Sequence, residues 1–145
     1  MKVKKLLLVF TFCGLALVSG CEQKDRLGRT KDYIRQSQNY YQKAVGLYKE
    51  LISQGKDLDR LHFELGQLYY AHGEFLKAVE EFKITTDARS KKFLATSYYR
   101  LGNFTDALDI FSKEESPDEE NLYYYGLTCE KLNLFDQALG IYKKI

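Results

Sequence analysis

The stretch that decides the fold runs from Tyr70 to Phe82 and reads "YAHGEFLKAVEEF". It aligns without gaps with "YRLGNFTDALDIF" at residues 99–111 and "EKLNLFDQALGIY" at residues 130–142. A fourth segment, "QSQNYYQKAVGLY" at residues 36–48, fits the same register. Each copy has glycine or asparagine, then an aromatic ring two residues later, an alanine three further on and an aromatic ring four beyond that. Such self-similarity is typical of a protein built from stacked structural repeats.

Every copy predicts the end of one helix and the start of the next. Glycine and asparagine tolerate the left-handed backbone conformation that ends a helix, and here they are Asn39, Gly73, Gly102 and Asn133. The apolar positions that follow recur at spacings of three and four, so they share one face of a helix. The alanine lets two helices approach closely while the aromatic rings fill the space beside it. The sequence therefore predicts an all-α fold of antiparallel helix pairs.

This pattern resembles the tetratricopeptide repeat, and the resemblance covers most of the chain after about Asp32. The repeated alanines are 34, 29 and 31 residues apart, against a family period of about 34. The first helix of each unit also matches the family, with Leu65-Gly66 and Tyr69, Leu94-Ala95 and Tyr98, then Tyr125-Gly126 and Cys129. The family's tryptophan is replaced by His62, Lys91 and Leu122. The resemblance implies an α-solenoid of about three repeats plus a leading helix over residues 32–145.

Two local features refine this expectation. The 29-residue unit implies a trimmed helix or turn between Phe82 and Phe93. Ser116 and Pro117 are predicted to be the N-cap and first residue of a helix. Residues from Thr30 to Gln54 are expected to form either one leading helix or a degenerate helix pair.

The first twenty residues have a different character. A basic start precedes thirteen mostly apolar residues, Leu6–Val18. As a helix these would span about 20 Å, too short for a bilayer core of roughly 30 Å, and the pattern is typical of a secretory signal peptide. The sequence Val18-Ser19-Gly20-Cys21 resembles the bacterial lipobox. That resemblance implies a signal peptide over residues 1–20 and a polar tether over residues 21–31. It also implies that Cys21 carries a lipid with acyl chains such as palmitate.

Composition excludes several classes of function. Without residues 1–20 the chain has 19 basic and 20 acidic side chains, so there is no nucleic-acid footprint. Cys129 has no cysteine partner in the mature chain and is expected to be a small buried packing residue. His62 and His72 lack the convergent ligands of a zinc site. No catalytic motif is present, so we expect no enzyme, no metal and no cofactor besides the lipid on Cys21.

The resemblance places a binding groove along the first helices of the units. A basic middle unit flanked by tyrosines favours a protein or peptide ligand, although these residues could equally be ordinary solvated side chains. The partner-binding positions that the resemblance implies are Arg60, Phe63, Gln67, Tyr70, Arg89, Lys92, Thr96, Tyr99, Arg100, Tyr123 and Lys131.

The sequence thus predicts a membrane-anchored scaffold or adaptor in the bacterial cell envelope, on the periplasmic side. Glu22 after the lipidated cysteine favours the outer membrane over the inner one. The family resemblance implies a protein partner from an envelope assembly. Two alternatives remain open. One is binding of peptidoglycan or another glycan by Tyr70, Tyr99 and Tyr123, and the other is self-association through an uncapped C-terminal helix.

Overall fold

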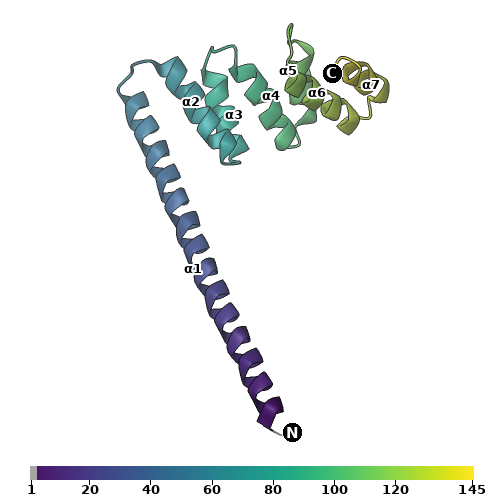
Figure 1. The fold of residues 1–145 in the computed structure, drawn as a ribbon. Helices are drawn as coiled ribbons and strands as arrows, with labels where there is room; N and C mark the ends of the chain where they lie inside the picture. The colour runs from purple at the N-terminus through teal and green to yellow at the C-terminus, as the bar shows by residue number, and fades with distance from the viewer. Residues whose placement is uncertain (1–2) are drawn as a thin grey trace. The chain divides into compact units, whose positions relative to one another are not determined.

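The structure, a computed structural model, describes the backbone of residues 3–145 and the side chains of residues 26–145. All regular secondary structure in this part of the chain is α-helical (Figure 1). Two compact units are present, Met1–Ala44 and Val45–Ile145. The helices are α1 (Val3–Ser53), α2 (Leu58–Ala71), α3 (Phe75–Ile84), α4 (Ser90–Arg100), α5 (Phe104–Ser112), α6 (Glu119–Lys131) and α7 (Phe135–Tyr142).

The six shorter helices form three antiparallel pairs that follow one another along the second unit (Figure 1). From α2 onward each helix packs against the next one in the chain. The first helix of the middle pair, α4, also packs against the first helices of both other pairs, α2 and α6. The fold is therefore an all-α solenoid of helix pairs, as predicted, and its first helices lie side by side in a row.

Three near-identical turns connect the two helices within each pair. Gly73, Gly102 and Asn133 have φ angles of 80°, 81° and 60°. In each turn the next N–H donates to a carbonyl five residues earlier, as in the 2.9 Å bond from Glu74 to Tyr69. This is the Schellman arrangement, which satisfies the last carbonyls of the first helix. These three predicted helix ends are confirmed.

The fourth predicted helix end, at Asn39, is wrong. Asn39 lies inside α1, and the chain turns later, where Gly55 and Asp57 have φ angles of 75° and 49°. The reason is that residues 36–45 contain neither glycine nor proline, so nothing forces the helix to stop. The leading segment is therefore a single helix up to Ser53 and not a degenerate pair.

Helix α1 also includes the residues predicted to be the signal peptide and the polar tether, residues 1–20 and 21–31, from Val3 onward. The side chain of Cys21 lies outside those that the structure describes, so its lipidation stays a prediction. Within the described residues, no helix combines the length and apolar character needed to span a bilayer.

The start of α6 differs from the prediction by two residues. Its N-cap is Asp118, whose side chain accepts a 2.8 Å hydrogen bond from the backbone N–H of Asn121. Ser116 and Pro117 instead lie outside the helix, in the linker. Aspartate is as good an N-cap as serine, and here it is the residue whose carboxylate reaches the third helical N–H.

The core lies where the two helices of each pair approach closely. The repeated alanines Ala78, Ala107 and Ala138 are 0–3% exposed. Gly66 of α2 supports the ring of Phe82, because a methyl group at this glycine would lie 2.6 Å from the ring. Gly126 of α6 makes room for the ring of Tyr142 in the same way, because an added methyl group would collide with that ring. The predicted small residues therefore set the distance between paired helices.

The last pair differs from the other two in its exposed face. Phe135 and Leu139 of α7 are 64% and 56% exposed, whereas Val79 of α3, the equivalent of Leu139, is 5% exposed. In the earlier pairs the following first helix covers these positions, since α4 packs on α3 and α6 packs on α5. The predicted apolar edge at α7 is thus present on the described chain.

Replacing Gly66 by alanine is predicted to destabilise the protein more than the same replacement at Gly126 or at Gly46. Gly66→Ala should lower the free energy of unfolding by about 1–3 kcal/mol, because the ring of Phe82 is 2% exposed and cannot move away. Gly126→Ala should cost less, since Tyr142 lies at the partly open end and can rotate. Urea unfolding followed by circular dichroism measures the difference.

The matched control is Gly46→Ala in α1, where nothing lies within 4 Å of the added methyl group. It should raise the free energy of unfolding by about 0.5–1 kcal/mol through helix propensity and chain entropy. Equal destabilisation by all three substitutions would contradict the packing argument.

Candidate functional site

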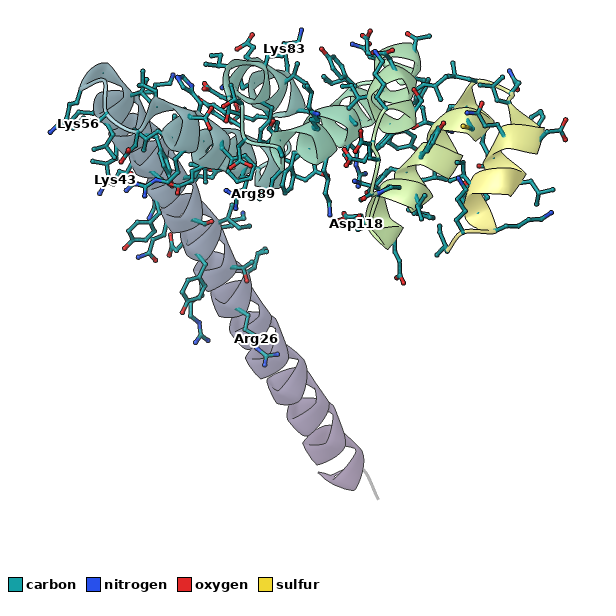
Figure 2. The ribbon with its side chains drawn as sticks, turned by 90° about the horizontal axis from the view of Figure 1, so that it is seen from above. Arg26, Lys43, Lys56, Lys83, Arg89 and Asp118 are labelled. Atoms are coloured by element: carbon teal, nitrogen blue, oxygen red, sulfur yellow. The ribbon has the colours of Figure 1, made fainter. Side chains whose placement is uncertain are left out.

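Four of the predicted binding residues line one cavity in the row of first helices. Phe63 and Gln67 come from α2, Arg89 from the linker before α4, and Lys92 from α4. Figure 2 shows Arg89 and Asp118 on one edge of the repeat helices and Lys83 on the opposite edge. The cavity has a volume of about 510 Å³, and its remaining lining residues are Ala88, Phe93, Glu114, Asp118 and Asn121.

The floor of this cavity is aromatic. The rings of Phe63 and Phe93 meet edge to face with centroids 6.0 Å apart, an arrangement that adds to their hydrophobic burial. Phe63 is 2% exposed, and the Arg89 guanidinium lies 4.4 Å from its ring centroid. Phe63 therefore belongs to the core beneath the groove, and the face it was predicted to offer a ligand is covered by Arg89.

Two cations of the middle unit, Arg89 and Lys92, are paired with nearby acids. The guanidinium of Arg89 contacts both carboxylate oxygens of Asp87, at 3.0 and 2.6 Å. This contact lowers the pKa of Asp87 and raises that of Arg89. Lys92 bridges Asp118 at 2.8 Å and Glu120 at 2.7 Å. The charges of Arg89 and Lys92 in the predicted basic groove are thus neutralised, because acids in the linkers and in the first turn of α6 reach these two cations.

Asp118 and Asn121 form the wall of the cavity that α6 supplies. Hydrogen bonds from Lys92, and then from the N–H of Asn121, lower the pKa of Asp118. The side chain of Asn121 is 6% exposed, and its Oδ1 atom has no hydrogen-bond partner in the described part of the chain. A buried polar atom without a hydrogen-bond partner lowers the free energy of unfolding. Asn121 is therefore a candidate for contact with a ligand that supplies the missing partner.

The predicted tyrosines form a second cluster along the same row. The rings of Tyr70 and Tyr99 pack against Phe75 and Phe104 of the paired helices, with centroids 5.5 and 5.6 Å apart. Burial is the main reason why the pKa of each of these two tyrosines is raised. Tyr123 is 50% exposed. Only the last of these three predicted stacking residues therefore presents a largely open ring.

A further tyrosine, Tyr124, joins this cluster and was not predicted. Its hydroxyl accepts a 2.7 Å hydrogen bond from Arg100, and its ring lies 5.4 Å from that of Tyr99 and 5.7 Å from that of Tyr123. Arg100 is therefore already engaged by the first helix of the next pair. The run Tyr123-Tyr124-Tyr125 was visible in the sequence, but which ring faces the groove depends on the exact start of α6.

The other predicted positions have simpler surroundings. Arg60 is exposed and lies 3.6 Å from Glu64 on its own helix, a surface pair that contributes little. Thr96 is 3% exposed, and its hydroxyl donates to the carbonyl of Lys92 at 2.9 Å. Lys131 is exposed in the last turn of α6. Thr96, predicted as a groove position, is therefore buried, with its hydroxyl bonded inside its own helix.

The reactive side chains outside the groove are used for packing. Cys129 is fully buried, as predicted, and burial raises the pKa of its thiol. Nδ1 of His62 lies 2.7 Å from a carboxylate oxygen of Glu81, which joins α2 to α3; this contact was missed because the two residues are far apart in sequence. Among the described residues, no group of three or more acidic, histidine or cysteine side chains could hold a metal ion.

Comparison with known proteins agrees with the repeat architecture. The family model described as "Anaphase-promoting complex, cyclosome, subunit 3" matches residues 82–145. This is a tetratricopeptide-type repeat family, and the match covers the two complete helix pairs from α4 to α7. A search of curated proteins found no significant match to the chain. The comparisons thus support a repeat of this type and the role of protein–protein interaction scaffold that such repeats suggest.

The Asp118 cap generates a prediction for stability against pH. Asp118→Ala should lower the free energy of unfolding at neutral pH by about 1 kcal/mol, because the N-cap hydrogen bond is lost. The carboxylate is favoured in the folded state, so its contribution is full above its ordinary pKa of about 3.9 and is lost as the pH falls through its lowered pKa. The gap between wild type and variant should therefore close in acid.

Urea unfolding at a series of pH values measures this gap. Glu115→Ala is the matched control, because Glu115 is an exposed acid in the same linker and should change stability little at any pH. A gap for Asp118→Ala that stays constant into strong acid would show that the carboxylate charge does not stabilise α6.

Proposed function

We propose that this chain is a lipid-anchored scaffold of the bacterial cell envelope that binds a protein or peptide partner along α2, α4 and α6. The observation that carries the binding role is the continuous row formed by these three helices, with a cavity at one part and the open ring of Tyr123 at another. A row of this kind offers an extended binding surface. The partner belongs to an envelope assembly on the periplasmic side, and the outer membrane is the favoured location.

Site-specific photo-crosslinking in native membranes tests the binding role. A photoreactive phenylalanine analogue at Tyr123, and separately at Gln67, should capture the same partner, because both positions belong to the proposed surface. The same analogue at Leu76 is the control, since Leu76 is 64% exposed but lies on the second helix of its pair. The purified partner should bind Tyr123→Ala about tenfold more weakly, the loss expected for truncating an interface tyrosine.

Capture of the same proteins at Tyr123, at Gln67 and at the control position Leu76 would contradict a specific binding surface on the first helices.

The exposed apolar face of α7 favours self-association as the second candidate function. The analogue at Phe135 examines it, because a crosslinked species of twice the chain mass at this position alone would assign the interaction to α7 instead.

The proposed anchor is supported by the lipobox-like residues around Cys21. Metabolic labelling with a palmitate analogue should mark the wild-type chain and leave Cys21→Ser unlabelled, because only a thiol can carry the thioether-linked lipid. The variant should also leave the membrane fraction on alkaline washing, since stable anchoring requires several acyl chains. Cys129→Ser is the control and should keep the label, as its thiol is buried. Equal labelling of both variants would contradict lipidation at Cys21.

A further inference from the structure

Two residues that line the cavity at Phe93 have hydrogen-bond acceptors that the protein itself leaves unused. The first is Oδ1 of Asn121, which is buried and has no partner among the described residues. The second is the carboxylate of Glu114, which lines the cavity, is half-buried and forms no ion pair with any described side chain. Both are acceptors, so they match a ligand that brings hydrogen-bond donors.

The one unpaired charge of the cavity lining is negative, although two of the lining residues are basic. Arg89 is held by Asp87, and Lys92 is shared between Asp118 and Glu120. Glu114 adds a carboxylate without a cation of its own. The lining has two cations and two carboxylates, and both cations are held by acids, two of which (Asp87 and Glu120) lie outside the lining. The unpaired charge is therefore that of Glu114, which favours a cationic ligand and disfavours an anionic one.

The apolar wall of the cavity favours a flat cation. The ring of Phe93 is half-buried and is held by Phe63 at 6.0 Å and Tyr70 at 5.4 Å, so it is a fixed surface. A guanidinium already lies over a phenyl ring here, that of Arg89 at 4.4 Å from the Phe63 centroid. A guanidinium is planar, stacks on rings and carries several donors in a fixed fork, whereas an ammonium is a compact and strongly hydrated charge.

We propose that this cavity receives an arginine side chain of the protein partner, with its guanidinium stacked near Phe93 and donating to Asn121 Oδ1 and the Glu114 carboxylate. The inference rests on the proposed scaffold function and adds the chemistry of the residue that is recognised. The guanidinium supplies the donor that Asn121 lacks. Lys92 keeps both of its carboxylates in the bound state, because the two acceptors used by the ligand are separate from them.

The test is titration of the isotope-labelled full-length chain in detergent micelles, followed by NMR of the Asn121 side-chain amide. The probes are N-acetyl-arginine amide, N-acetyl-citrulline amide, which has the same shape without the charge, and N-acetyl-glutamate amide. The arginine probe should shift the Asn121 signal saturably and bind about tenfold more tightly than the citrulline probe. The glutamate probe should leave the signal unchanged.

Substitutions locate the interaction. Glu114→Gln should weaken the arginine probe about tenfold, while Glu115→Gln, an exposed neighbour that does not line the cavity, should not change its affinity. Asn121→Leu, which removes the acceptor at similar volume, should abolish saturable binding; this variant is followed through the backbone amide signal of Glu114, because it lacks the Asn121 side-chain amide. Because Glu114→Gln removes a charge without changing shape, it keeps the test valid even where Asn121→Leu impairs folding.

The outcomes separate this inference from the scaffold function. Capture of a partner at Tyr123 together with no shift of Asn121 by the arginine probe, or equal binding of the arginine and citrulline probes, overturns the arginine site and leaves the scaffold intact. Tighter binding of the glutamate probe also overturns it. Saturable arginine binding that is lost in Glu114→Gln supports the site, and the absence of any captured partner would then count against the scaffold function alone.

Discussion

The close approach of the two helices in each pair is the constraint on which the rest of the structure depends. It is made possible by residues without a large side chain at the contact, Ala78, Ala107 and Ala138 on the second helices and Gly66 and Gly126 on two of the first. The aromatic rings then fill the space beside the contact, where they gain hydrophobic burial and ring contacts. With this distance fixed, the first helices are brought into one row, and the groove follows from that row.

The elements that could be predicted from sequence are those decided locally. Helix faces follow from spacing, and the ends at Gly73, Gly102 and Asn133 follow from residues that tolerate a left-handed backbone. The same argument failed at Asn39, because asparagine permits a helix to end but does not require it. Helix α1 ends only at Ser53, before the left-handed residues Gly55 and Asp57. A permitted break becomes an actual one where packing of the next helix favours it, and that cannot be deduced from one segment.

The candidate site was predictable in position but not in charge. The lining positions Phe63, Gln67 and Lys92 followed from the repeat register. Their electrostatics depend on residues from the next unit, such as Asp118, which lies 26 positions after Lys92 and contacts it at 2.8 Å. Such a pairing is defined only when the stacking and the exact start of α6 are known. The unpartnered Oδ1 of Asn121 belongs to the same class, since an atom lacks a partner only in a particular three-dimensional setting.

The pairing of Lys92 also decides which ligands can enter without disturbing the fold. Asp118 both caps α6 and holds Lys92, so an acidic ligand must compete with two carboxylates for the ammonium and weaken a contact between α4 and α6. A cationic ligand faces no such competition, because Oδ1 of Asn121 has no hydrogen-bond partner and the Glu114 carboxylate has no ion pair in the described chain. Binding of an anion would thus be weakened by the contacts between repeats that it must break. A guanidinium would instead supply the hydrogen bond that a buried acceptor lacks. The same residues that join the repeats therefore select the sign of the charge that the cavity accepts.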